Sequence, residues 1–263
     1  MIKTIALVSL LCLSLGAQEK GAEDKTTKAP TLKQDERGLA VFKKFSSLIY
    51  RPRIAGLKEV RFQVSIEQLD EARPKESQVT TSGPFFFHWK ADKTVVVDKS
   101  GKVVPINPAL QQRIMADAVG IDPEILLKSH HVSLESPNSV RFSIPKGQDL
   151  KAPIRSTLYT ADEQGRLQKQ ALCDAQGRVV FAVSYQYRKR GDLWLVKSSS
   201  ATGIGTSARE ISHVHLAGWT VPTRVIVRAG KVRHTFRYRK WKFGAPKSSK
   251  PAPPTSKPTP KSH

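Results

Sequence analysis

The sequence predicts an α+β protein that is mostly antiparallel β-sheet, and three observations favour this class. A turn-forming pentapeptide occurs twice, twelve residues apart, as DEQGR from Asp162 and as DAQGR from Asp174. In each copy the Asp starts a turn and the Gly supplies a positive φ. The residues that follow alternate, and one face holds Val179, Phe181, Val183, Tyr185 and Tyr187. The opposite face holds Arg178, Ser184, Gln186 and Arg188, so we expect a sheet that is buried on one face only. The third observation is an amphipathic helix that precedes the strands.

The first ordered segment is a helix followed by a strand. From Glu36 to Tyr50, apolar residues recur at spacings of three and four, which predicts an amphipathic helix that Asp35 starts and that ends before Pro52. Residues 60–66 then alternate strictly between apolar and polar side chains. This pattern is typical of a strand with one buried face.

Residues 77–98 predict two or three strands, broken at Gly83-Pro84 and at residues 91–93. Phe85, Phe86 and Phe87 are consecutive, and three neighbouring side chains of a strand cannot all point the same way. Either both faces of this strand are covered, or one ring lines a ligand cavity or faces solvent. Residues 107–128 predict a helix, a break at Gly120 and a second short helix.

The chain from residue 132 to residue 243 predicts strands only. Besides the strands around the repeated turns, these are residues 132–144, 193–196, 211–216, 220–228 and 231–243. In the last strand, alternation places Phe236 and Tyr238 on one face and the basic side chains on the other. The basic side chains are those of Arg233, Arg237 and Arg239. The same alternation places Trp241 on the basic face.

Composition divides the chain into four parts. Residues 1–17 combine Lys3, a short apolar run and small residues at the end, which predicts a signal peptide. Residues 18–35 are charged and aperiodic and predict a flexible lead-in, residues 36–243 predict one domain, and residues 244–263, rich in Pro and Lys, predict a disordered tail. We therefore expect an exported protein, either periplasmic or otherwise associated with the cell envelope.

The formal net charge is +22, and +17 of it falls on residues 36–243, because the tail contributes four lysines, Lys3 one, and residues 18–35 are balanced. The domain itself is therefore basic, which favours anionic partners: lipid head groups, an acidic envelope polymer or nucleic acid. Strand alternation separates most aromatic side chains from the arginines, whereas a base-stacking surface would mix them. Nucleic acid is therefore the least favoured of these partners.

No pattern in the sequence indicates catalysis. His213 and His215 share a strand face, but no Cys or acidic residue stands at a spacing that would complete a metal site, so we expect no metal and no cofactor. A Gly-x-Ser-x-Gly nucleophile motif is absent from the sequence. Once the signal peptide is removed, Cys173 is the only cysteine, and its place at a strand end favours a small buried hydrophobe.

Three segments carry a resemblance to a known family. Gly83–Trp89 (GPFFFHW) is similar to a passage of glycine, aromatics and tryptophan, Val140–Pro145 (VRFSIP) to an apolar strand closed by proline, and Trp219–Val227 (WTVPTRVIV) to a run of aromatic, proline and strand. Together with the order of elements, these segments resemble the LolA-like superfamily of bacterial lipoprotein carriers and lipoprotein-sorting proteins. Over residues 36–243 the resemblance implies an eleven-stranded half-barrel, a curved antiparallel sheet that covers a few helices. It also implies an apolar hollow for acyl chains and no catalytic residues.

We therefore expect an exported, non-catalytic protein that binds a lipid or an acylated protein. The predicted ligand-binding residues are Phe62, Phe85, Phe87, Phe142, Phe181 and Tyr185, with Leu110 and Met115 as a helical lid. Arg233, Arg237 and Arg239 are predicted to contact anionic head groups or an anionic membrane surface. The alternative function is a basic structural or interaction domain that binds an acidic envelope polymer or a protein partner.

Overall fold

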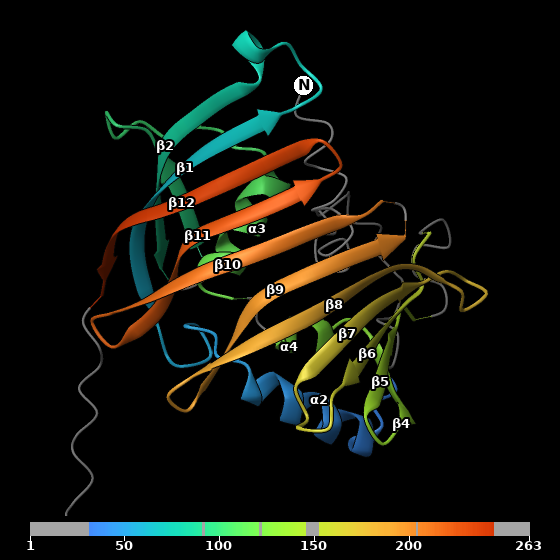
Figure 1. Cartoon of the computed structure of the whole chain (residues 1–263). Helices are drawn as coiled ribbons and strands as arrows, with labels where there is room; N and C mark the ends of the chain where they lie inside the picture. Colours follow the sequence, from blue (N-terminus) through green and yellow to red (C-terminus); the bar gives the residue numbers. More distant parts are fainter. Residues whose placement is uncertain (1–31, 91–92, 121–122, 146–152, 204, 245–263) are drawn as a thin grey trace, which may run out of the picture.

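The computed structural model describes residues 32–90, 93–120, 123–145, 153–203 and 205–244. They form two layers: one antiparallel sheet of twelve strands, and helices that lie against one of its faces (Figure 1). We call the face covered by the helices the inner face and the opposite one the outer face. The predicted signal peptide and all but Gly244 of the predicted tail lie outside the described residues.

The sheet is open, with the strand order β3-β2-β1-β12-β11-β10-β9-β8-β7-β6-β5-β4. Its strands are β1 (Glu59–Asp70), β2 (Val79–Lys90), β3 (Lys93–Val97), β4 (His131–Ser136), β5 (Ser139–Ser143), β6 (Ser156–Ala161), β7 (Leu167–Cys173), β8 (Val179–Arg190), β9 (Leu193–Gly203), β10 (Ser207–Leu216), β11 (Trp219–Ala229) and β12 (Val232–Phe243). The helices are α2 (Glu36–Leu48), the single 3-10 turn η1 (Lys75–Ser77), α3 (Pro108–Ala118) and α4 (Glu124–Leu127). The predicted fold class is confirmed, as a half-barrel that does not close.

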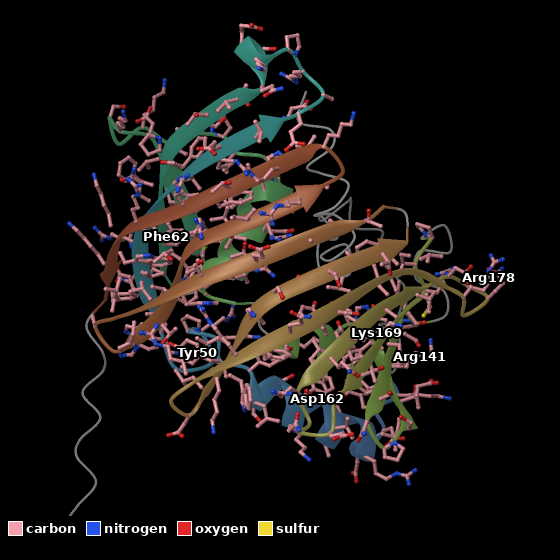
Figure 2. The ribbon with its side chains drawn as sticks, viewed as in Figure 1. Tyr50, Phe62, Arg141, Asp162, Lys169 and Arg178 are labelled. Carbon is pink, nitrogen blue, oxygen red and sulfur yellow. The ribbon has the colours of Figure 1, made fainter. Side chains whose placement is uncertain are left out.

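The strand count is one higher than the resemblance implies. Residues 132–144, predicted as one strand, fold into the hairpin β4–β5, because Pro137 and Asn138 form a turn between them. The two repeated turns are confirmed. In the first, Asp162 Oδ1 accepts the backbone N–H of Arg166 at 2.8 Å, and in the second Asp174 Oδ1 accepts that of Arg178 at 2.9 Å. Figure 2 shows Arg178 at the tip of the β7–β8 hairpin.

Helix α2 begins where the sequence predicts it. The side chain of Asp35 caps it by accepting the N–H groups of Arg37 at 2.9 Å and Gly38 at 3.2 Å. The end of the predicted flexible lead-in is paired with the sheet, since Asp35 N–H donates to Val132 O at 3.0 Å and Val132 N–H donates to Lys33 O at 2.9 Å. Residues 33 and 35 of the predicted lead-in are therefore hydrogen-bonded to β4.

Strand β2 is continuous, so the predicted break at Gly83-Pro84 is wrong. The register against β1 shifts between Val64 and Ile66, and this β-bulge accommodates Pro84 within the strand. Gly83 has a φ of +91°, and a Cβ there would lie 2.9 Å from Val64 O, so only glycine fits. Beyond the bulge, Phe85 and Phe87 pack on the inner face, while Phe86 pairs with Gln63 on the outer face.

A second bulge moves Trp241 to the face opposite the predicted one. Lys240 has a φ of +53°, and the register between β1 and β12 shifts at this point, so the alternation of β12 changes phase. Trp241 consequently stacks on Phe62 of the inner face, with ring centroids 4.6 Å apart. A register shift also affects the start of β8, where Val179, predicted to be inner, is 54% exposed.

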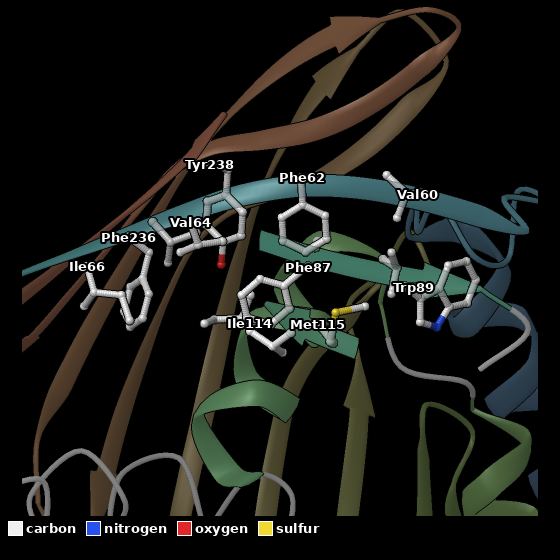
Figure 3. Close-up of a cluster of buried hydrophobic side chains, with 14 of the residues drawn as sticks. Val60, Phe62, Val64, Ile66, Phe87, Trp89, Ile114, Met115, Phe236 and Tyr238 are labelled. Atoms are coloured by element: carbon white, nitrogen blue, oxygen red, sulfur yellow. The ribbon is translucent and has the colours of Figure 1, made fainter. Parts of the chain in front are cut away.

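The apolar side chains of the inner face form three separate clusters. One gathers β1, β2, β11 and β12 around α3, and Figure 3 shows Phe62, Phe87 and Tyr238 close to Ile114 and Met115. A second packs α2 on β5 and β6, where the rings of Phe42 and Phe142 are 4.6 Å apart. The third lies under the neighbouring strands β7, β8 and β9. Helices α2 and α3 therefore each fill one end of the curved sheet.

Candidate functional site

A cavity of about 270 Å³ lies between these clusters, under the inner face of strands β6 to β11. This volume is near the lower end of the range of small-molecule sites. The side chains that line it are those of Phe42, Phe45, Ser46, Ile49, Tyr50, Arg51, Pro52, Arg113, Ala116, Asp117, Gly120, Pro123, Leu126, Tyr159, Leu167, Gln170, Phe181, Val183, Tyr185, Tyr187, Val196, Ser199, Ala201, Ser207, Arg209, Ile211, His213, Thr220, Pro222 and Val227.

The walls at the α2 end are apolar and aromatic. Phe42 and Phe45 come from successive turns of α2, and Tyr159 from β6 packs against both rings. The middle strands contribute small inner side chains, Ser199 and Ala201. Because these two side chains do not reach the helices, space remains where the clusters would otherwise meet. Tyr50, labelled in Figure 2, closes one side, and its hydroxyl accepts the N–H of Thr220 at 3.1 Å.

The opposite end of the cavity carries a buried charged group. The carboxylate of Asp117, whose side chain is 2% exposed, pairs with Arg113 one turn earlier on α3, where Nε and Oδ2 are 3.3 Å apart. Arg209 of β10 forms an ion pair with the other carboxylate oxygen. The Tyr238 hydroxyl donates to Asp117 Oδ2 at 3.5 Å. Two guanidinium groups therefore share one carboxylate, and the group carries a net positive charge.

Burial shifts the pKa values of the groups around Asp117. Desolvation lowers the pKa of Arg209, an effect that the Asp117 charge opposes. Burial, and then the same carboxylate, raises the pKa of the Tyr238 hydroxyl well above its ordinary value. Desolvation, followed by the charges of Arg188 and Arg209, lowers the pKa of His213 to about 4. His213 is therefore a neutral imidazole at neutral pH.

The structure divides the predicted ligand-binding residues into two sets. Phe181 and Tyr185 line the cavity, and the Tyr185 hydroxyl donates to Gln170 at 3.1 Å. The other six do not line it: Phe62, Phe85, Phe87, Leu110 and Met115 pack in the α3 cluster, and Phe142 packs in the α2 cluster. A ligand role for these six stays a prediction, because they fill the two ends of the sheet between which the cavity lies.

The predicted head-group arginines lie on the outer face. Their neighbours Phe236 and Tyr238 pack on α3, so alternation directs Arg233, Arg237 and Arg239 away from the cavity. Arg237 is near Glu67, with 3.6 Å between the charged atoms. These arginines therefore cannot touch the head group of a ligand in the cavity, and only a separate anionic partner could reach them.

Sequence reasoning did not select the charged residues that line the cavity. Asp117 and Arg209 are 92 residues apart in the chain. One local signal was available for Arg209, because it shares a strand face with Ile211, which belongs to the α3 cluster. The small residues Ser198, Ser199, Ser200 and Ala201, consecutive in a long strand, were a second signal.

The remaining candidate groups have structural partners. His213 Nδ1 accepts a hydrogen bond from Arg188 at 3.0 Å, and His215 Nδ1 is 3.1 Å from Thr220 Oγ1. Cys173 is buried. Within the described ranges, no group of three or more His, Cys, Asp or Glu side chains is placed to hold a metal ion. None of the described helices is long and apolar enough to cross a membrane.

The fold and the cavity define a class, an open half-barrel with a hollow between its sheet and its helices. No protein-family model matches the chain. No curated protein matches its sequence. Among solved structures, a LolA superfamily protein from Nitrosomonas europaea is similar, with 11% identity and a TM-score of 0.36 over 79% of this chain and 94% of that one.

Two further solved structures are similar over 79% of this chain and 92% of their own length. One is a DUF1329 family protein from Desulfovibrio piger, with 6% identity and a TM-score of 0.35. The other is a putative outer membrane lipoprotein-sorting protein domain from Vibrio parahaemolyticus, with 9% identity and a TM-score of 0.33. The first of these three structures is described as a LolA superfamily protein and the third as a lipoprotein-sorting protein domain.

Proposed function

We propose that this protein binds a hydrophobic ligand, an acyl chain of a lipid or of an acylated protein, and that it is an exported, non-catalytic protein of the bacterial cell envelope. The observation that carries the proposal is the cavity of about 270 Å³ beneath the middle strands. A space of this size among apolar side chains lacks the contacts that close packing would give, and an acyl chain would supply them. Export is supported by the signal-peptide pattern of residues 1–17.

Two neighbouring serines of β9 allow a matched test of ligand binding. Ser199 lines the cavity, whereas Ser198 points to the outer face and donates to Gln186 at 2.9 Å. Ser199→Phe should fill the cavity, and Ser198→Phe should make the same chemical change outside it. The protein is purified after secretion and examined by native mass spectrometry and lipid extraction.

The wild type and Ser198→Phe should carry a co-purifying lipid or take up an added fatty acid, and Ser199→Phe should bind neither. The proposal fails if the wild type holds no extractable lipid and binds no acyl probe. It also fails if both serine variants retain the ligand to the same extent.

A second function is favoured by the outer face. There Arg224 lies directly opposite Arg237 and Arg228 directly opposite Arg233 on paired strands. Like charges directly opposite each other on paired strands destabilise a sheet. Glu67 and Glu210 each pair with one of these arginines. A surface with this charge would bind an acidic polymer or an acidic protein.

Retention on an immobilised polyanion at increasing salt tests this second function. The double variant Arg224→Gln with Arg237→Gln should elute at clearly lower salt than the wild type. Its control, Lys43→Gln with Lys44→Gln, removes the same charge from α2 on the other side of the molecule. Equal elution of both double variants would reject a specific role of the outer face.

A further inference from the structure

Part of strand β2, near one margin of the sheet, is an exposed edge (Figure 1). β2 has twelve residues, but β3 pairs with it only over residues 86–90. Residues 79–82 pair with β1 on their other side, and residues 79–83 are all exposed. No other described segment forms a backbone hydrogen bond with this stretch. The backbone groups that point away from β1 can therefore pair with an added strand.

The outermost strands of the sheet are covered, in contrast to this stretch. At β4, Val132 N–H donates to Lys33 O at 2.9 Å. At β3, Val104 N–H donates to Val96 O at 3.0 Å. Folded proteins commonly shield their edge strands in this way, because an unpaired edge associates with other strands. Among the described residues, neither kind of cover reaches residues 79–83 of β2.

The exposed stretch also lacks the charges that commonly keep two sheet edges apart. Charged residues make up 25% of the chain, yet residues 78–87 contain none. Val79, Thr80 and Thr81 belong to residue types that favour strands. Neither charge nor strand propensity therefore opposes the pairing of this edge with another strand.

The stretch is complementary to a second copy of itself. In an antiparallel pair centred on Thr81, small uncharged residues of the two copies face each other: Thr81 with Thr81, Thr80 with Ser82, and Val79 with Gly83. Cross-strand pairs of Thr with Thr or Ser stabilise a sheet. Pro84, which has no N–H, follows at the bulge, so regular pairing ends there.

The positive charge of the outer face does not oppose this pairing. Residues opposite each other in an antiparallel pair share a face, so both outer faces lie on the same side of the joined sheet. β1 separates β2 from β12, which carries Arg233 and Arg237. The two β12 strands therefore lie five strand spacings apart, about 24 Å. This distance exceeds the Debye length of about 8 Å at physiological salt, so the arginines of one copy are screened from those of the other.

We infer that two copies of this chain associate through residues 79–83 of β2, as an antiparallel pair centred on Thr81, and that their sheets join into one. The inference goes beyond ligand binding and does not depend on the cavity. It also joins the two basic outer faces into one wider surface. A contact of five residues from each copy is smaller than a standard interface, so the dimer should be weak and depend on concentration.

Analytical ultracentrifugation of the secreted protein over roughly 10 to 500 μM tests the inference. The average mass of the wild type should rise with concentration from that of one chain towards that of two. Thr81→Lys places two positive charges opposite each other at the centre of the pair and should stay monomeric. Thr202→Lys makes the same change at an exposed threonine of β9, which pairs with Ala182 of β8, and should associate as the wild type does.

Cross-linking tests the register of the pair. Thr81→Cys should face its own copy, so a short bis-maleimide should link it into a dimer several times faster than it links Thr202→Cys. Cys173 is buried and should contribute little to either reaction. A wild type that is monomeric at every concentration overturns the inference. A dimer that survives Thr81→Lys, or that Thr202→Lys also abolishes, overturns the role of this edge. Equal cross-linking of the two cysteine variants overturns the pairing centred on Thr81.

Discussion

The charge of Asp117 should be needed for stability, because it is the acid that Arg113 and Arg209 share. Asp117→Asn keeps the shape of the side chain and removes the negative charge that Arg113 and Arg209 share, at a site where the carboxylate is 2% exposed. Removing one partner of a buried ion pair costs about 3–5 kcal/mol. Arg113 and Arg209 are 14% and 18% exposed, so water and the amide oxygen of Asn recover part of this cost. We expect a loss of about 2–4 kcal/mol, a large share of the roughly 5–15 kcal/mol that stabilises a typical domain.

Urea denaturation followed by tryptophan fluorescence measures this loss. With an m-value of about 2–3 kcal/mol/M, the midpoint should fall by roughly 1 M. Glu210→Gln is the matched control, because Glu210 forms an exposed ion pair with Arg228 at 2.8 Å, and its loss should cost less than about 1 kcal/mol. A loss below about 1 kcal/mol for Asp117→Asn would refute the reasoning, because Arg113 and Arg209 would then not need Asp117 as a counter-charge.

Three further predictions concern single residues. The pKa of His213 is about 4 in the folded state, below its unfolded value, so its contribution to stability is complete above about pH 6.5 and is lost towards pH 4. His213→Asn should therefore reduce the loss of stability between about pH 6.5 and pH 4 by about 1–3 kcal/mol, measured as urea midpoints at a series of pH values. Lys240→Gly should raise the unfolding free energy by about 1 kcal/mol without changing Trp241 fluorescence, and no gain would contradict strain at the bulge. Gly203→Ala should lower the free energy of unfolding by more than about 2 kcal/mol, since its Cβ would lie 2.3 Å from Val180 O. Gly191→Ala, whose Cβ would meet nothing within 4 Å, should lower it by about 1 kcal/mol. Equal losses of stability in thermal melts of the two variants would contradict the close approach at Gly203.

The elements that the sequence predicted correctly depend on interactions within a few residues. The cap of α2 by Asp35 and the two turns from Asp162 and Asp174 are contacts within four residues, and their signals lie in the residues themselves. The face pattern of β1 was equally readable, because Val60, Phe62, Val64 and Ile66 alternate without interruption. Local chemistry thus predicts which segments are strands and which residues of a regular strand are buried.

The errors arise where pairing with a distant strand changes the phase of the alternation. Trp241 was assigned to the outer face because nothing in residues 231–243 shows that Lys240 adopts a positive φ opposite Phe62 of β1. The ion pair at the cavity was missed for a similar reason, since Asp117 of α3 and Arg209 of β10 are far apart in the sequence and meet only in the fold. Aromatic residues were favoured as cavity walls, yet the cavity forms where side chains are small, at Ser199 and Ala201.

The small side chain of Ser199 should favour ligand binding at the expense of stability. A larger residue at Ser199 would gain dispersion contacts with the surrounding apolar side chains, and cavity-filling substitutions commonly stabilise a protein by about 0.5–2 kcal/mol. Ser199→Phe should therefore unfold at a higher urea concentration than the wild type and lose its ligand. Ser198→Phe should unfold at the same urea concentration as the wild type and keep its ligand. A variant that is more stable but empty would show that the cavity serves binding rather than folding. If Ser199→Phe were instead destabilised by more than about 1 kcal/mol, the space would be too small for the ring, and an acyl chain could enter only by displacing the helices.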